Sequence, residues 1–152
     1  MNLNEALTTL KAAGYKLIKE ADAGKIYLCY SLYGGRAHYN PENIYIHAIS
    51  DNKLAISNTI TNWALTGPDD ISWCGAIVID NTVAEKYRPL IGKDVVDTDD
   101  GNELFKLIDN NQYEFNGTDF MHIFAKYEDE DDPAEAATVE VQDYIEDQLA
   151  GL

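Results

Sequence analysis

The last 26 residues, Tyr127 to Leu152, read YEDEDDPAEAATVEVQDYIEDQLAGL. They contain ten Asp and Glu residues and no Lys or Arg, so they carry a charge of −10, while the preceding 126 residues carry −6. A charge imbalance of this size bears on partners and solubility more than on the fold. The order of the residues within the segment, however, also predicts how it folds.

An amphipathic helix is predicted over residues 133–150. Asp132 provides an N-cap, Pro133 suits the first helical position, and Glu135 follows three residues after the cap. At about 100° per residue, one side of this helix is apolar; its members are Ala134, Ala137, Val141, Tyr144, Ile145 and Leu149. Val139 is the one apolar residue on the opposite side. The apolar side must pack on another part of the chain.

The other side of this helix, and the run before it, are acidic. The run consists of Glu128, Asp129, Glu130, Asp131 and Asp132, and the helix adds Glu135, Glu140, Asp143, Glu146 and Asp147. A block of like charges is typically solvated. On the helix, like charges three or four residues apart destabilise it by about 0.2–0.5 kcal/mol per pair. Two interpretations stay open: a surface that meets a basic partner, and a tail that only keeps the protein soluble.

The composition is that of a single globular domain spanning residues 1–152, with 45% apolar residues and 11% aromatic residues. The sequence has neither a signal-peptide pattern nor an apolar run of membrane-spanning length, which predicts a cytoplasmic protein without membrane contact. The net charge of −16 argues against direct binding to nucleic acid. Cys29 and Cys74, without CxxC spacing, are expected to be buried thiols.

Hairpins dominate the first half of the chain, after a predicted helix over residues 2–13. Alternating and β-branched residues predict strands at 15–21, 25–33, 43–50 and 54–61, with turns at 22–24 and 51–53. Residues 62–70 are expected to form a loop. The nearly continuous apolar run from 71 to 80 is predicted to be the central buried strand.

The second half is expected to be richer in helix. Residues 82–87 predict a short helix, and Asp100 is expected to cap a second helix over 101–109, after an acidic loop at 94–100. A turn is expected at 116–117, and alternating aromatics favour a strand over 120–127. The sequence thus predicts an α+β fold: an antiparallel sheet of about five or six strands built from hairpins, with the N-terminal and C-terminal helices packed on one face.

Catalytic motifs are missing from the sequence. His38, His47 and His122 show no metal-ligand spacing, and neither a nucleophile elbow nor a Walker A loop is present. The acidic loop before residue 101 fails the register of a calcium loop, because Val96 occupies the first ligand position. We therefore predict no catalytic residue, no metal site and no cofactor. Whether the cysteines and histidines meet in space cannot be read from their spacing.

The function predicted from these features is inhibition of a target protein by mimicry of a nucleic acid. Helical residues three or four apart lie about 5–6 Å from one another, comparable to the spacing of successive phosphates. In composition alone (small, acidic, rich in Tyr and Asn) the chain resembles phage-encoded antirestriction and anti-CRISPR proteins. This resemblance implies a nuclease or a CRISPR effector as the basic partner, in the cytoplasm of a host cell.

The residues expected to contact the partner are the ten carboxylates of the C-terminal segment, together with Asp97, Asp99 and Asp100. The alternative function is an immunity protein or antitoxin that binds one basic toxin through the same face. A second alternative is a small enzyme or small-molecule binder whose acidic tail is only solubilising. A structural role in a virion or a homo-oligomer also stays open, and the oligomeric state is not predicted.

Overall fold

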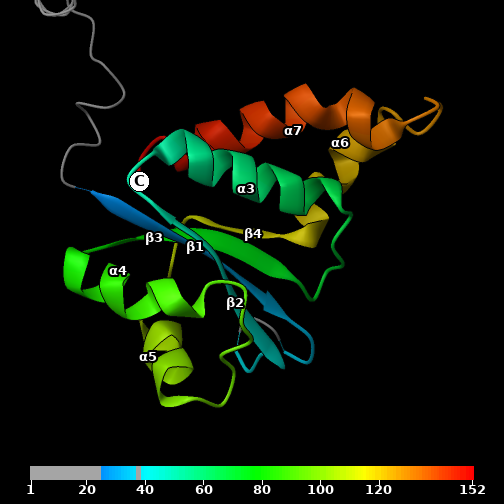
Figure 1. Cartoon of the computed structure of the whole chain (residues 1–152). Helices are drawn as coiled ribbons and strands as arrows, with labels where there is room; N and C mark the ends of the chain where they lie inside the picture. Colours follow the sequence, from blue (N-terminus) through cyan, green and yellow to red (C-terminus); the bar gives the residue numbers. More distant parts are fainter. Residues whose placement is uncertain (1–24, 37–38) are drawn as a thin grey trace, which may run out of the picture.

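The computed structural model describes residues 25–36 and 39–152 (Figure 1). The predicted helix over residues 2–13, the strand over 15–21, the turn at 22–24 and His38 lie outside the described residues.

An antiparallel sheet forms the centre of the described structure. Its four strands are β1 (Ile26–Tyr33), β2 (Asn43–Ser50), β3 (Trp73–Ile79) and β4 (Glu114–Asn116), in the order β2-β1-β3-β4. The prediction of an α+β protein with an antiparallel sheet is confirmed, although the sheet described here has fewer than the expected five or six strands. β3 lies between β1 and β4, as its continuous apolar sequence indicated.

The segment predicted as a strand over 54–61 is instead helix α3 (Lys53–Leu65). Asn52, expected in a hairpin turn, caps this helix: its side chain accepts a hydrogen bond from the backbone N–H of Leu54 at 3.0 Å. β-Branched residues suggested a strand, but Ile56, Ile60 and Ala64 recur at a spacing of four and all face the core. The helical period therefore outweighed the local β propensity. The helix also takes up the first residues of the predicted loop over 62–70.

The strand predicted over 120–127 is also helical. Residues Gly117–Phe120 form the 3-10 helix η2, which continues into α6 (Met121–Ala125). Asn116 begins this turn, and Asp119 accepts a hydrogen bond from the backbone N–H of Asn116 at 2.8 Å. Asn116 and Asp119 thus form a capping box, and a helix begins where the sequence predicted a turn at 116–117. The alternation of aromatic residues over 120–127 therefore did not indicate a strand. His122, within this segment, lies on helix α6.

The remaining helices agree more closely with prediction. They are α4 (Asn81–Tyr87), the 3-10 turn η1 (Arg88–Leu90), α5 (Asp99–Ile108) and α7 (Pro133–Leu149). The cap of α5 is not Asp100, as predicted, but Thr98, whose hydroxyl accepts a hydrogen bond from the N–H of Gly101 at 2.9 Å. α7 begins after the predicted cap, Asp132.

Helices cover both faces of the sheet, not the single face expected (Figure 1). On one face, alternate β1 residues such as Tyr27 and Cys29 pack under α3, α6 and α7. On the other, Leu28, Tyr30 and Leu32 pack against α4 and α5. A strand buried on both faces has a nearly continuous apolar sequence, as β1 has apart from the buried Ser31. The two acidic helices, α5 and α7, therefore lie on opposite sides of the sheet.

No helix within residues 25–36 and 39–152 is both long enough and apolar enough to cross a membrane.

Candidate partner-binding surface

Helix α7 is held in a fixed orientation by its cap and its buried face. Asp132 accepts a hydrogen bond from the backbone N–H of Glu135 at 3.1 Å, and Pro133 occupies the first turn. The fully buried residues of the helix are Ala137, Val141, Ile145 and Leu149. They belong to the core that also contains residues of α3, so the two helices lie side by side over the sheet (Figure 1). The opposite face of α7 is consequently fixed toward solvent.

That outer face is anionic along its length. Glu135, Asp143 and Asp147 are exposed, and Glu146 is partly exposed. Val139, which is 70% exposed, is the apolar exception predicted from the sequence. Among the described residues, no Lys, Arg or His forms an ion pair with any of these four carboxylates. Glu146 accepts one hydrogen bond, from the Gln142 amide at 3.2 Å.

Glu140 differs from these four. Its carboxylate accepts a hydrogen bond from the Lys126 ammonium at 2.7 Å and another from the Tyr127 hydroxyl at 3.0 Å. The hydrogen bond from Lys126 is the main cause that lowers the pKa of Glu140. Glu140 therefore ties α7 to the end of α6, and its charge is partly neutralised within the protein.

The acidic run before α7 is a series of turns at the surface. Glu128, Asp129, Glu130, Asp131 and Asp132 are all exposed. The N–H of Glu130 donates to the carbonyl of Tyr127 at 3.0 Å, which closes the first of these turns. With the outer face of α7 they form what we call the acidic surface: residues 128–132 together with Glu135, Asp143, Glu146 and Asp147.

The predicted loop residues are not part of this surface. Asp99 and Asp100 lie in the first turn of α5, where the helix dipole favours negative charge. Asp100 also forms an ion pair with Lys86 at 3.4 Å. Asp97 precedes the helix with a positive φ of 62°. Because α5 packs on the other side of the sheet, the structure does not bring Asp97, Asp99 and Asp100 together with the acidic surface.

The two cysteines meet inside the protein. Cys29 on β1 and Cys74 on β3 are free and fully buried, with their sulfur atoms 4.0 Å apart. Burial raises the pKa of Cys74 well above its usual range. A buried thiol of raised pKa is a poor nucleophile.

The described histidines are dispersed. Nε2 of His47 lies 2.6 Å from the hydroxyl of the buried Ser31, on the neighbouring strand. Loss of water around the ring lowers the pKa of His47. His122 contacts the ring of Tyr144 edge-on, with the centroids 6.4 Å apart. Within the described ranges, no group of three or more His, Cys, Asp and Glu residues is arranged to hold a metal ion.

A polar cluster crosslinks the sheet near its β4 edge. The Tyr30 hydroxyl donates a hydrogen bond to Glu114, while the Asn111 amide donates to the Tyr30 hydroxyl and to the Ala76 carbonyl, both at 3.0 Å. Burial is the main cause that raises the pKa of Tyr30. A side chain at Gly75 would meet this hydroxyl, since its Cβ would lie 2.8 Å away. The cluster therefore joins β1, β3 and β4.

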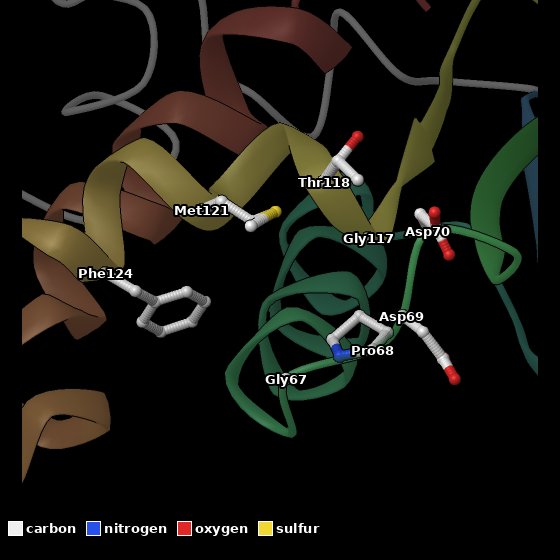
Figure 2. A pocket seen from close by; sticks show the side chains of 8 residues that line it. All are labelled: Gly67, Pro68, Asp69, Asp70, Gly117, Thr118, Met121 and Phe124. Atoms are coloured by element: carbon white, nitrogen blue, oxygen red, sulfur yellow. The ribbon is translucent and has the colours of Figure 1, made fainter.

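A pocket that the sequence did not indicate lies between the loop after α3 and the start of α6. It has a volume of about 390 Å³, and Met121 and Phe124 of α6 form one side of it (Figure 2). Sequence reasoning missed it because it placed 120–127 in a strand. The 65% exposure of Met121 was not foreseeable from its local sequence.

Comparisons of this chain with protein-family models, with curated proteins and with solved structures found no match.

Proposed function

We propose that this chain is an acidic inhibitor that binds the positively charged, nucleic-acid-binding surface of another protein. The observation that supports the proposal is the acidic surface itself. Its nine carboxylates come from one turn segment and one helix face, and none of them pairs with a described cation. A partner's Lys and Arg side chains would find charges that no cation within residues 25–36 and 39–152 neutralises.

The geometry of α7 suits such a partner. Asp143 and Asp147 are four residues apart on a helix held by its buried face, so their exposed side chains are neighbours on its outer face. An array of fixed negative charges steers a basic protein toward it and raises the rate of encounter. The partner class we favour is a nuclease or a CRISPR effector of a host cell. A basic toxin, bound by an immunity protein, would use the same surface.

Affinity capture tests the proposal. Tagged chain is expressed in the cells that encode it, and the retained proteins are identified at about 0.05 M and about 0.5 M salt, which shortens electrostatic screening from over 10 Å to a few ångströms. We expect a partner with a basic groove that is lost at the higher salt. Retention that ignores ionic strength would contradict the proposal.

A charge-matched pair of variants sharpens this test. Asp143→Lys with Asp147→Lys reverses two carboxylates of the acidic surface. Glu85→Lys with Asp109→Lys makes the same change of charge on α4 and after α5, on the other side of the sheet. We expect only the first pair to lose the partner. Equal loss in both would show that net charge alone, and not this surface, attracts it. A nuclease among the captured proteins favours inhibition, whereas a toxin encoded next to this chain favours immunity.

A further inference from the structure

The pocket beside α6 is held open by backbone packing. Gly117, at the start of η2, touches the loop after α3 so closely that a Cβ there would lie 2.2 Å from the carbonyl oxygen of Asp69 and 2.4 Å from that of Pro68. The Asn116 amide donates a hydrogen bond to the carbonyl of Asp70 at 2.6 Å. These contacts fix the loop against η2. The pocket is therefore part of the folded structure and does not depend on a ligand to form.

One wall of this pocket is apolar. Met121 and Phe124 project from α6, and Pro68 faces them from the loop (Figure 2). Met121 is 65% exposed. Methionine is flexible and polarisable, and it is common where a surface adapts to a partner's side chain. An apolar stem would replace water on this wall.

The other wall is acidic. The ionisable side chains that line the pocket are Asp69 and Asp70, both exposed at its rim on the loop side (Figure 2). Pro68, on the same loop, has no N–H to donate. The pocket lining thus offers negative charge at one end and apolar surface at the other. A long cationic side chain has both properties, in the same order along its length.

We propose that this pocket takes an arginine side chain from the basic partner, a proposal that rests on the proposed function. The methylene stem packs on Met121 and Phe124, and the guanidinium reaches the carboxylates of Asp69 and Asp70. Arginine suits the pocket better than lysine because its planar group stacks on an aromatic ring, carries five donors and is more weakly hydrated. The volume of about 390 Å³ is at the small end for a ligand pocket, which fits one side chain.

The pocket also lies next to the acidic surface. Helix α6 carries the pocket's apolar wall and leads into the acidic turns over 128–132, so this part of the acidic surface adjoins α6, while the outer face of α7 extends away from it (Figure 1). A partner held by the acidic surface would have basic side chains within reach of the pocket. The acidic surface then attracts the partner, and the pocket selects among its cationic side chains.

Methionine methyl NMR tests the proposal directly, because the chain contains only two methionines, Met1 and Met121. Protein labelled at the methionine methyl groups is titrated with N-acetyl-arginine amide, N-acetyl-lysine amide and N-acetyl-glutamine amide. We expect the Met121 signal to shift saturably with the arginine probe, less with lysine and not with glutamine. The Met1 signal should stay in place. A response to all three probes, or to none, overturns the proposal.

Variants that each remove one negative charge then locate the binding. Asp69→Asn and Asp70→Asn should each weaken the arginine probe about two- to fivefold, the range for solvent-exposed ion pairs. Asp51→Asn and Asp109→Asn remove one charge each away from the pocket, and they should leave the titration unchanged. Identical weakening in all four variants would show a general charge effect and overturn the pocket as the site.

The two proposals fail separately. If Met121 does not respond while the Asp143→Lys, Asp147→Lys pair still loses the partner, the arginine pocket is wrong and the proposed function stands. If Met121 responds selectively while that pair retains the partner, the pocket binds arginine but the acidic surface is not the partner site.

Discussion

Helices α5 and α7 both bury one face and both carry several carboxylates, but the positions of those carboxylates differ. In α5, Asp99 and Asp100 lie in the first turn and Lys106 lies in the last. Each charge is therefore opposite in sign to the partial charge at its end of the helix, which is favourable. Lys86 of α4 pairs with Asp100 and also with Glu103. The charges of α5 are therefore explained by the stability of the helix itself.

Asp143, Glu146 and Asp147 of α7 have no such explanation. Its last turn contains no basic residue, and Glu146 and Asp147 lie near the C-terminal end, where the dipole disfavours negative charge. Asp143 is four residues from Asp147 and three from Glu140, so it adds repulsion. Lysine at alternate positions would keep the helix soluble and make it more stable. Carboxylates that lower the stability of their own helix are expected where they serve binding.

The largest effects should be equal in the two helices, because both depend on buried faces. Ile145 of α7 and Leu104 of α5 are fully buried. Replacing either with alanine removes buried methyl groups and leaves a cavity, which should lower the free energy of unfolding by about 2–5 kcal/mol. Urea denaturation followed by circular dichroism measures this. Val139→Ala on the exposed face of α7 is the control, with a change within about 0.5 kcal/mol. A comparable loss from Val139→Ala would mean that the outer face of α7 is packed.

The capping residues should give an intermediate effect. Asp132→Ala removes the acceptor for the Glu135 N–H, and Thr98→Ala removes the acceptor for the Gly101 N–H. Each should lower the unfolding free energy by about 0.5–2 kcal/mol, measured by thermal or urea unfolding. Serine at either position should restore most of the loss. Alanine variants as stable as the wild type would show that the two helices do not begin where the structure places them.

The comparison between the helices is sharpest for a single charge reversal. Asp147→Lys removes repulsion with Asp143 and places a cation at a helix C-terminus, so it should raise the unfolding free energy by about 0.5–1 kcal/mol. Asp99→Lys makes the same change at a helix N-terminus and should lower it by about 0.3–1 kcal/mol. Unfolding at low salt measures both, and high salt should shrink both effects. Effects of the same sign would remove the distinction between α5 and α7.

The smallest effect concerns pH. The Lys126 ammonium lowers the pKa of Glu140 below its ordinary value of 4.5, so folding favours the ionised carboxylate. The stabilisation is present above that ordinary value and is lost as the pH falls through the lowered pKa. Glu140→Gln should therefore be slightly less stable than the wild type at neutral pH, and the difference should vanish in acid. Urea midpoints across this range measure it. A difference that grows on acidification would contradict the ion pair.

Much of the fold was predictable because local signals agreed with tertiary packing. β2 lies where it was predicted, from Asn43 to Ser50, and the Asp132-Pro133 start of α7 was explicit in the sequence. α3 was misread because its β-branched residues favour strands, although Ile56 and Ile60 have helical spacing. That error, together with the one at α6, produced an excess of strands. Which sheet face a helix covers depends on chain connections that residue patterns do not encode.

The candidate site was predictable only in part. The acidic face of α7 followed from helical spacing, and Val139 was placed correctly on it. The pairing of Glu140 with Lys126 could not be predicted, since it depends on α7 folding back against the end of α6. Predicting that Asp97, Asp99 and Asp100 lie apart from α7 would also have required knowing that α5 and α7 pack on opposite faces of the sheet. The pocket beside Met121 depends on the contact of Gly117 with a loop almost fifty residues earlier in the chain.

The most direct test of the central claim is partner capture by the Asp143→Lys, Asp147→Lys variant, in a sample whose unfolding free energy is at least that of the wild type. The proposed function predicts that this equally or more stable protein retains little of the partner that the wild type holds at low salt. Undiminished capture would contradict it, and the carboxylates of α7 would then serve solubility alone.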